Sequence, residues 1–387
     1  MLSILSALSL VSLALGAPTA TPTGKWLVVL KPNSNASPVS VLQSYGDISK
    51  TVSEDHVYDI GSFKGFAAHM TTEQLNAMKV DPRVAYMEQD GVVKTQILEV
   101  RKTDVTEVDA PWGLGRVSHR SKGSSDYLYQ STAGAGSCAY IIDTGVFAAH
   151  PEFEGRATQI KSYTGVKTDD NGHGTHVAGT IGSATYGVAK KSKIFAVKAL
   201  DGSGTGSWSD IIAGIQFVVG HYKKNTCPSG AVVNMSLGGD KSVSINAAVA
   251  AAVDAGIFFA VAAGNESVDF VGTSPADEPK AFAVGASDIT DSFADFSNFG
   301  KTLGAIAPGV DVLSTWNDGG TKSISGTSMA TPHIAGLAAY LGALNGAISP
   351  AAMRTKIQSL ATANAILLPS FVKSGGTPNK LAFNGFK

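Results

Sequence analysis

The sequence has few charged residues and only two cysteines. Charged side chains make up 16% of its 387 residues, and the formal net charge is −1 at pH 7. This balance gives no reason to expect binding to nucleic acid or to an anionic membrane surface. Two cysteines exclude a dense disulfide framework, so the fold must depend on its hydrophobic core. The low charge and the 43 glycines argue against a coiled coil or a disordered chain and favour a turn-rich α/β protein with one large and one smaller domain.

Long apolar runs are also missing, except at the start of the chain. Residues 1–16 are apolar and uncharged, but the segment is too short to span a bilayer comfortably. Ala14 and Gly16 are small residues placed as at a signal-peptidase cleavage site. We therefore expect residues 1–16 to be a secretory signal peptide that lacks only a basic n-region, with a membrane anchor as the alternative. The mature protein is then expected to be extracellular and soluble.

Residues from about 22 to 90 have the pattern of a small α+β unit. Apolar runs predict strands at residues 26–30, 63–69 and 84–87. Ser37-Pro38 predicts the start of one helix, and Thr71 followed by Gln74 has the capping-box spacing that begins another. From about residue 90 to 109 the pattern stops and charges become more frequent, as in an exposed linker.

The rest of the chain alternates strand and helix patterns. Strands buried on both faces are predicted at residues 139–142, 194–197, 232–233 and 257–261. Apolar helix faces are predicted over residues 211–222 and 245–253. This alternation predicts a parallel sheet with helices on both faces and with functional residues at the carboxyl ends of the strands.

Three segments carry side chains suited to nucleophilic catalysis. Asp143 follows a predicted strand, although such an aspartate taken alone is more often a turn or cap residue. His173 lies between two glycines that leave its ring accessible, while its spacing to His176 leaves a metal pair as an alternative without an evident third ligand. Ser328 opens an apolar helix, where unpaired N–H groups gather, but most serines at such positions are helix N-caps.

The order Asp143, His173, Ser328 is the order of the catalytic triad in subtilisin. The motifs around these residues resemble the signatures of the subtilase family of serine proteases. They are YIIDTGV at residues 140–146, HGTHVAG at residues 173–179 and GTSMATP at residues 326–332. The resemblance extends over essentially the whole chain after the predicted signal peptide. It is strongest to the fungal proteinase K branch, through residues 150–157 and 186–191.

Residues 63–69 and 81–90 resemble the inhibitor-type prodomain of secreted subtilases, which assists folding, blocks the cleft and is cut away. The resemblance implies that residues 17–100 are a ferredoxin-like α+β prodomain with its linker. It also implies that residues 101–387 are a subtilisin-like α/β catalytic domain. The cut is expected within about residues 96–106, because an exposed linker gives a protease access to the backbone.

The resemblance also implies a role for each site residue. Ser328 attacks the peptide carbonyl, His173 takes and returns the proton, and Asp143 fixes the imidazole. Asn265 donates to the oxyanion together with the Ser328 N–H, although it is alternatively a turn residue or, in Asn-Glu-Ser, a glycosylation site. The substrate-binding residues implied are Gly202, Ser203, Gly204, Ser236, Leu237, Gly238, Ala263 and Gly264, of which Leu237 and Ala263 line an apolar pocket for the residue before the cut.

Two positions differ from the proteinase K-like relatives. Gly304 stands where those enzymes have an aspartate that binds structural calcium, so the usual calcium site is doubtful here. Phe282 stands at a cysteine position of a second disulfide in other relatives, which leaves Cys138–Cys227 as the one implied bond. We expect no cofactor in catalysis and no catalytic metal ligand.

The sequence therefore predicts a secreted serine endopeptidase of broad specificity that prefers apolar or aromatic residues before the cut. It is expected to be a monomer made as a zymogen that processes itself, with protein substrates and its own prodomain as partners. An esterase of the α/β-hydrolase kind would need a Gly-x-Ser-x-Gly elbow and the order Ser, Asp, His, and the sequence has neither. A binding protein on an inactive protease scaffold would need a broken triad or oxyanion hole, and all four residues are present.

Overall fold

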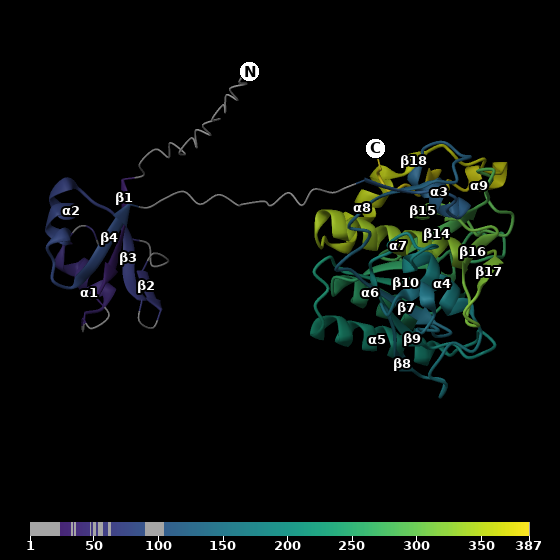
Figure 1. Cartoon of the computed structure of the whole chain (residues 1–387), viewed down its shortest axis with the longest axis horizontal. Helices are drawn as coiled ribbons and strands as arrows, with labels where there is room; N and C mark the ends of the chain where they lie inside the picture. The colour runs from purple at the N-terminus through teal and green to yellow at the C-terminus, as the bar shows by residue number, and fades with distance from the viewer. Residues whose placement is uncertain are drawn as a thin grey trace, which may run out of the picture. The chain divides into compact units, whose positions relative to one another are not determined.

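The structure, a computed structural model, describes residues 24–89 with short gaps and residues 104–386. The gaps are residues 32–33, 35, 47, 49–51, 53–56 and 61–62. Contacts within the chain define two compact units, residues 1–100 and residues 101–387, which Figure 1 shows. The predicted signal peptide and most of the segment predicted to be cut lie outside the described residues.

In its described residues, the smaller unit contains a four-stranded antiparallel sheet and two helices. Its elements are β1 (Lys25–Leu30), α1 (Pro38–Ser44), β2 (Val57–Ile60), β3 (Phe63–His69), α2 (Thr72–Lys79) and β4 (Val84–Gln89). The strand order is β2-β3-β1-β4, and neighbouring strands are antiparallel. A β-α-β-β-α-β chain in this order has the predicted ferredoxin-like arrangement.

Local signals begin both helices of this unit. Ser37 accepts a hydrogen bond from Ser40 N at the start of α1, and Thr71 and Gln74 form the predicted capping box at the start of α2. Buried apolar side chains from the sheet and both helices form the core: Val28, Leu30, Val41, Leu42, Phe66 and Met78. The sequence does not predict β2, because four residues at a sheet edge are too few to separate a strand from a loop.

The larger unit begins with β5 (Asp104–Glu107), α3 (Trp112–Ser118) and β6 (Tyr127–Gln130). Its main sheet contains β7 (Cys138–Asp143), β8 (Ala157–Ser162), β9 (Lys193–Lys198), β10 (Ala231–Met235), β12 (Phe258–Ala262), β14 (Phe282–Ser287), β15 (Ala305–Pro308), β18 (Thr362–Ala363) and β19 (Lys380–Leu381). Two short antiparallel pairs are β11 (Gly239–Asp240) with β13 (Thr273–Ser274) and β16 (Val312–Thr315) with β17 (Thr321–Ile324). The helices are the 3-10 helix η3 (Pro151–Phe153), α4 (His173–Gly182), α5 (Trp208–Lys224), α6 (Val243–Asp254), α7 (Thr327–Asn345), α8 (Pro350–Leu360) and α9 (Ser370–Ser374).

The main sheet is parallel, as predicted, apart from its last strand. Its order is β18-β19-β15-β14-β12-β10-β7-β9-β8, and only β18 runs antiparallel to its neighbour among the described strands. Alternate residues of β7 enter different cores: Ala139 and Ile141 face one, while Tyr140 and Ile142 face the other. The predicted strands all fall within or overlap observed ones.

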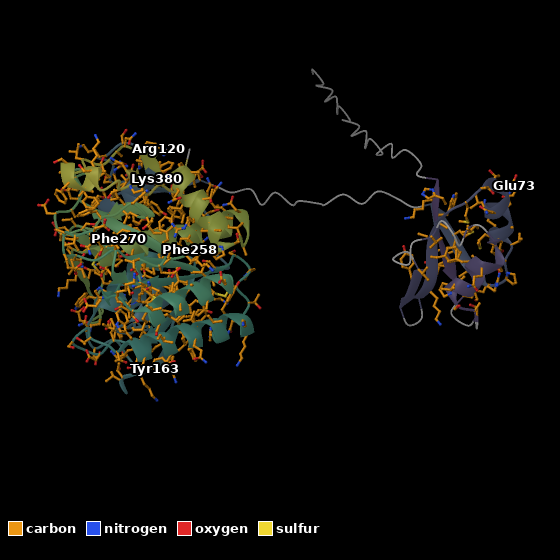
Figure 2. All side chains as sticks on the ribbon, turned by 180° about the vertical axis from the view of Figure 1, so that it is seen from behind. Glu73, Arg120, Tyr163, Phe258, Phe270 and Lys380 are labelled. Atoms are coloured by element: carbon orange, nitrogen blue, oxygen red, sulfur yellow. A yellow bond between two sulfur atoms is a disulfide. The ribbon has the colours of Figure 1, made fainter. Side chains whose placement is uncertain are left out.

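Helices cover both faces of this sheet (Figure 1). The core with Ile141 includes side chains of α3, α4, α7 and α8, and the core with Tyr140 includes side chains of α5 and α6. Phe258 and Phe270, labelled in Figure 2, are buried in the first and the second core respectively. Apolar strands without a polar face therefore have a helix layer on each side, as such strands require.

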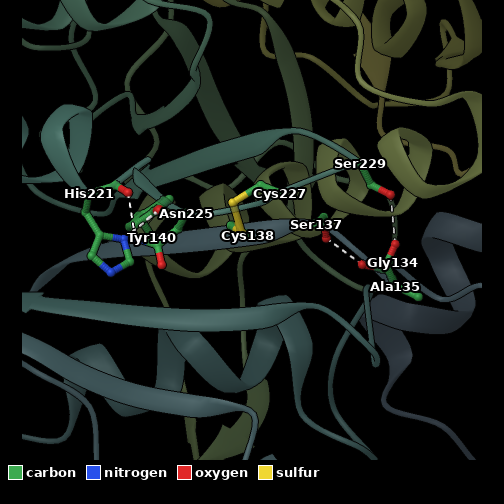
Figure 3. Close-up of a disulfide and its surroundings, with 9 residues drawn as sticks. All are labelled: Gly134, Ala135, Ser137, Cys138, Tyr140, His221, Asn225, Cys227 and Ser229. Carbon is green, nitrogen blue, oxygen red and sulfur yellow. Dashed lines mark hydrogen bonds between the residues drawn. A yellow bond between two sulfur atoms is a disulfide. The ribbon is translucent and has the colours of Figure 1, made fainter. Parts of the chain in front are cut away.

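Cys138 and Cys227 form the implied disulfide, shown in Figure 3. Cys138 is the first residue of β7, and Cys227 lies in the loop between α5 and β10. The bond therefore lies at the amino end of β7. Close to it, Tyr140 is hydrogen-bonded to His221 Nδ1 at 2.9 Å.

In the described part of the chain, we find no single helix with the length and apolar composition needed to cross a membrane. α7 and α8 meet that test only together, with a bend of 102° between them.

Candidate active site

Asp143 and His173 are joined at the carboxyl edge of the main sheet. Asp143 is the last residue of β7 and is fully buried. His173 is the first residue of α4, and its Nδ1 lies 2.7 Å from Asp143 Oδ1. The same carboxylate oxygen accepts the N–H of Thr144 at 2.7 Å. The carboxylate thus fixes the ring through Nδ1 and leaves Nε2 as the nitrogen available to a substrate or nucleophile.

A second buried carboxylate, Asp169, builds the turn that presents this histidine. Its Oδ1 accepts the N–H groups of Asn171 and Gly172, and its Oδ2 accepts both the N–H and the hydroxyl of Thr175. The hydroxyl of Thr144, the residue after Asp143, also donates to Asp169. Sequence reasoning missed this residue, whose only signal is an acidic side chain shortly before the N-terminus of a helix.

Ser328 is the second residue of α7, whose N-cap is Gly326, so Ser328 is not the N-cap. Pro332, four residues later, has no N–H, and the Ser328 carbonyl therefore lacks the usual helical donor. Ser236 Oγ fills that place, donating to Ser328 O at 2.7 Å. Ser236 directly follows β10, the neighbour of β7, so this bond holds the start of α7 beside the strand that carries the aspartate.

The Ser328 hydroxyl itself donates to Ser236 O at 3.2 Å. A hydroxyl has one proton, so in this conformer Ser328 does not donate to the His173 ring. In the structure, Asp143 is therefore hydrogen-bonded to His173, and Ser328 is hydrogen-bonded to Ser236. Ser328 is not hydrogen-bonded to His173. Catalytic hydrogen bonds are often long or misaligned in a free enzyme and form fully only with substrate. Proton transfer from Ser328 requires its hydroxyl to turn away from Ser236.

Asn265 follows β12 and is oriented by the start of α7. Its Oδ1 accepts the N–H of Thr327 at 2.8 Å and the Thr327 hydroxyl at 2.9 Å. Because the oxygen is engaged twice, the Nδ2 end of the amide is left to donate. Asn265, Thr327 and Ser328 line the same cavity, so this donor is beside Ser328.

Two cavities share a wall formed by Leu237, Gly238, Gly239 and Asp240. The first, of about 680 Å³, is also lined by His173, Ser203, Gly204 and Ser236, together with the apolar side chains of Leu200, Trp208 and Ile211. The second, of about 400 Å³, is lined by Ser328 and Asn265 and also by Ala262, Gly264, Glu266 and Val268. Histidine and serine therefore border adjoining parts of one groove.

Two of the predicted substrate-binding residues do not line these cavities. Ala263 is fully buried, and its neighbours Ala262 and Gly264 are the lining residues. Gly202 accepts a hydrogen bond from Asn171 Nδ2 through its carbonyl, while Ser203 and Gly204 line the larger cavity. The other predicted substrate-binding residues, Ser236, Leu237, Gly238 and Gly264, all line at least one cavity.

The histidines differ in their charge environment. Burial lowers the pKa of His173, but the Asp143 charge and hydrogen bond outweigh it, so the net pKa is raised above the ordinary value of 6.5. Burial lowers the pKa of His176 to about 4, and its Nε2 lies 2.9 Å from Val312 O. That backbone contact occupies Nε2 of the His176 ring. Among the described residues, no group of three or more His, Cys, Asp or Glu side chains could hold a metal ion.

The position of the usual calcium ligand contains no oxygen donor on a side chain. A Cβ atom at Gly304 would lie 2.5 Å from the ring of Phe282. The two residues that differ from the proteinase K-like relatives are therefore in contact with each other. The Gly304 carbonyl accepts a hydrogen bond from Gln358 Nε2 at 3.0 Å. A carboxylate is missing, an aromatic ring fills its space, and these residues do not fit a calcium ion, which prefers oxygen ligands.

Comparison with known proteins gives matches over both units. The Subtilase family model matches residues 134–380, and the model described as peptidase inhibitor I9 matches residues 25–96. The chain is 54% identical over 338 residues to the cuticle-degrading protease of Metarhizium anisopliae, covering 87% of this chain and 84% of that protein. It is 49% identical over 333 residues to Proteinase R of Parengyodontium album, covering 86% and 82%.

Among solved structures, the chain is similar to the crystal structure of a cold adapted subtilisin-like serine proteinase. The TM-score is 0.66 and the sequence identity is 41%. The match covers 71% of this chain and 98% of the solved chain.

Proposed function

The chain belongs to the subtilase family and is a serine endopeptidase, and on this premise we propose that Asp143, His173 and Ser328 form its catalytic triad. The observation that carries the proposal is the 2.7 Å contact between Asp143 Oδ1 and His173 Nδ1 at the carboxyl edge of the sheet. A triad needs an imidazole held in one tautomer by a buried carboxylate, and this contact provides it.

In the proposed reaction, Ser328 Oγ attacks the peptide carbonyl while His173 Nε2 takes the hydroxyl proton. The imidazolium that forms is stabilised by Asp143 and then returns the proton to the leaving amine. A water molecule repeats the sequence on the acyl-enzyme and releases the acid product. The raised pKa of His173 supports this role, because it indicates that the site favours the protonated ring.

We propose that Asn265 Nδ2 and the Ser328 N–H stabilise the oxyanion. The two hydrogen bonds from Thr327 to Asn265 Oδ1 support this role, since they leave Nδ2 to donate beside Ser328. The Ser328 N–H lies in the first turn of α7, where N–H groups have no helical acceptor. A preorganised donor pair of this kind is usually the largest single contribution to acyl transfer.

The proposed substrate is an extended segment of a protein with an apolar or aromatic residue before the cut. Residues 203–204 and 236–238 line the larger cavity, which supports main-chain pairing with the substrate, and such pairing asks little of the substrate sequence. Leu237, Ala262 and Val268 give the cavity beside Ser328 apolar walls that support the preference. Peptide anilides that differ only in the residue before the cut test it: kcat/KM should be higher for Phe and Leu than for Ala and Glu. Equal values would overturn the specificity.

We propose that the enzyme is secreted, acts as a monomer, and is made as a zymogen whose I9-type unit binds and inhibits the catalytic unit until it is removed. The match of both units to their family models supports the zymogen. Adding the separately expressed prodomain to processed enzyme should inhibit it, and full activity at excess prodomain would contradict the proposal.

We also propose that the calcium site at Gly304 is lost. The contact between Gly304 and the Phe282 ring supports this proposal. The expected result is the same melting temperature for the Ser328→Ala variant with and without excess EGTA, measured by calorimetry. A fall on adding EGTA that calcium reverses would contradict it.

The proposed nucleophile is tested by labelling with a serine-directed fluorophosphonate. One equivalent should bind, mass spectrometry should place it on Ser328, and binding should abolish peptide hydrolysis. A label on another residue with loss of activity would reject the assignment.

A further inference from the structure

Asn298 is a fully buried side chain in the loop between β14 and β15. It lies outside the motifs that identify the active site and does not line either cavity of the groove. Within the described part of the chain, the hydrogen bonds of its side chain all go to residues 263–268, and this segment carries Asn265. The buried Asn298 amide thus hydrogen-bonds to the loop that carries the proposed oxyanion donor, which suggests a role in placing that donor.

All four hydrogen-bonding positions of this amide are used. Asn298 Nδ2 donates to Ala263 O at 3.1 Å and to Glu266 Oε2 at 2.7 Å. Asn298 Oδ1 accepts the N–H groups of Glu266 and Val268, each at 3.0 Å. An amide side chain has two donors and an oxygen with two acceptor sites, so its capacity is filled. A buried amide whose donors and acceptor sites all have hydrogen-bond partners favours a single side-chain geometry.

The packing around Gly264 leaves this geometry little freedom. Gly264 has φ +106°, a region that side chains rarely adopt. A Cβ atom there would lie 2.3 Å from Asn298 Nδ2 and 2.6 Å from Glu266 Oε2. The Asn298 N–H also donates to Gly264 O at 2.9 Å. The glycine thus allows the two side chains to approach the backbone next to Asn265.

Glu266 connects the buried amide to the oxyanion donor. The oxygen that accepts from Asn298, Glu266 Oε2, also accepts the backbone N–H of Asn265 at 2.9 Å. On its other side, Asn265 is held through Oδ1 by Thr327. The main chain of Asn265 is therefore fixed from one direction and its side chain from another.

We propose that Asn298 is a positioning residue for catalysis: acting through Glu266, it fixes the backbone of Asn265 so that Nδ2 points at the developing oxyanion. This inference rests on the proposed oxyanion role of Asn265. An oxyanion hole accelerates the reaction only when its donors are already aimed at the oxygen, because reorienting them costs part of the stabilisation. The alternative is that Asn298 merely stabilises the loop.

Asn298→Asp separates these two roles. The substitution keeps the size of the side chain, removes both donated hydrogen bonds and places a negative charge beside Glu266. We expect kcat to fall roughly tenfold or more with KM within about twofold, since an interaction made only in the transition state affects kcat. Asn384→Asp is the matched control: Asn384 is also buried, donates to Leu128 O and accepts from Phe386 N, and its change should leave kcat unaltered.

A double-mutant cycle with Asn265→Ala gives the decisive comparison. All variants are matured by a trace of wild-type enzyme, which is then inactivated and removed. In the Asn265→Ala background, Asn298→Asp should change kcat by less than about twofold, because the donor it positions is gone. The same loss of kcat in both backgrounds would overturn the inference and leave a structural role. If Asn265→Ala itself keeps wild-type kcat, the proposed oxyanion role fails instead, and the inference fails with it.

Glu266→Ala tests the same path if Asn298→Asp does not fold. Glu266 is exposed and belongs to neither hydrophobic core of the larger unit, so its replacement removes no apolar packing from them. Its loss of kcat should also disappear in the Asn265→Ala background, whereas any change in KM from the cavity wall should remain. Persistence of the kcat loss without Asn265 would overturn the inference.

Discussion

Asp143 determines both the orientation and the protonation of His173. The Asp143 carboxylate is fully buried and accepts a hydrogen bond from the His173 ring at 2.7 Å. Replacing it with an amide of the same size therefore changes the tautomer and pKa of His173 without opening a cavity. The pKa of His173 is raised because the attraction to Asp143 exceeds the cost of burial. A general base must be neutral to accept a proton. Activity should therefore decline on the acid side as pH falls through a pKa that lies above 6.5.

Asp143→Asn should lower kcat by roughly 10⁴, the loss seen for this change in another triad, because the amide favours the wrong tautomer. The acid limb of kcat/KM should also move to lower pH, since the charge that raises the pKa of His173 is gone. The pH profile of a peptide anilide measures both effects. Asp254→Asn, which changes an exposed carboxylate paired with Lys280, is the control. An acid limb that does not move would contradict this account of the base.

The proposed catalytic residues are recognisable from the sequence. The residues that position them through hydrogen bonds are not. Asp143, His173 and Ser328 stand in short motifs, and glycines or a strand end mark their places. Asp169 and Asn298 have no such signal, because each acts through hydrogen bonds to segments far along the chain or to loop backbone that only the fold brings near. Ala263 shows the limit within a motif, since its neighbour Ala262 faces the cavity instead.

At the scale of the elements, α7 carries Ser328 in its first turn and continues as a mostly apolar, buried helix. Pro332 interrupts the helical hydrogen bonds and releases the Ser328 carbonyl to Ser236, which the sequence did not predict. One position later, His333 is buried and hydrogen-bonded through Nδ1 to Met329 O at 2.9 Å. Burial lowers the pKa of His333 to about 4. His333 is thus a buried residue of α7 that is neutral at pH 7.

This histidine should make stability depend on pH. In the unfolded chain the pKa of His333 is near 6.5, and in the folded chain it is about 4. Between these two pH values the unfolded state therefore binds a proton at His333 that the folded state does not bind. Stability is then complete above pH 6.5 and falls as pH drops toward about 4, by roughly 3 kcal/mol for this residue. Denaturant unfolding of Ser328→Ala, which avoids self-digestion, measures it. His333→Gln in that background should reduce the slope with pH, and an equal slope would contradict the assignment.

The element boundaries show where sequence patterns are informative. Continuous apolar runs located β7, β9, β10 and β12, because strands buried on both faces need no alternation. The helix predicted over residues 211–222 is α5, which spans Trp208–Lys224. Short elements such as β2 and β11 were not predicted, because two to four residues contain no measurable period.

At the scale of the whole molecule, the disulfide and the proposed active site lie at opposite ends of β7. Cys138 is its first residue and Asp143 its last, which separates them by roughly 17 Å of extended chain. The bond joins residues 89 positions apart, so it restricts a long loop of the unfolded chain. Its contribution should therefore appear in stability rather than in catalysis.

Replacing both cysteines with alanine should lower the free energy of unfolding by roughly 2–4 kcal/mol. Denaturant unfolding in the Ser328→Ala background measures this loss. The same double substitution in the active enzyme should leave kcat/KM at 25 °C unchanged. A large fall in kcat/KM with unchanged stability would contradict the separation of the two sites.

The central claim is that residues from distant parts of the chain form one proteolytic site with Ser328 as its nucleophile. The most direct test compares wild type with Ser328→Ala, both expressed as the full chain, by following precursor mass and casein hydrolysis. The account predicts that wild type loses its prodomain and digests casein, while the variant keeps its prodomain and is inactive. A variant that is processed and digests casein at the wild-type rate would contradict it.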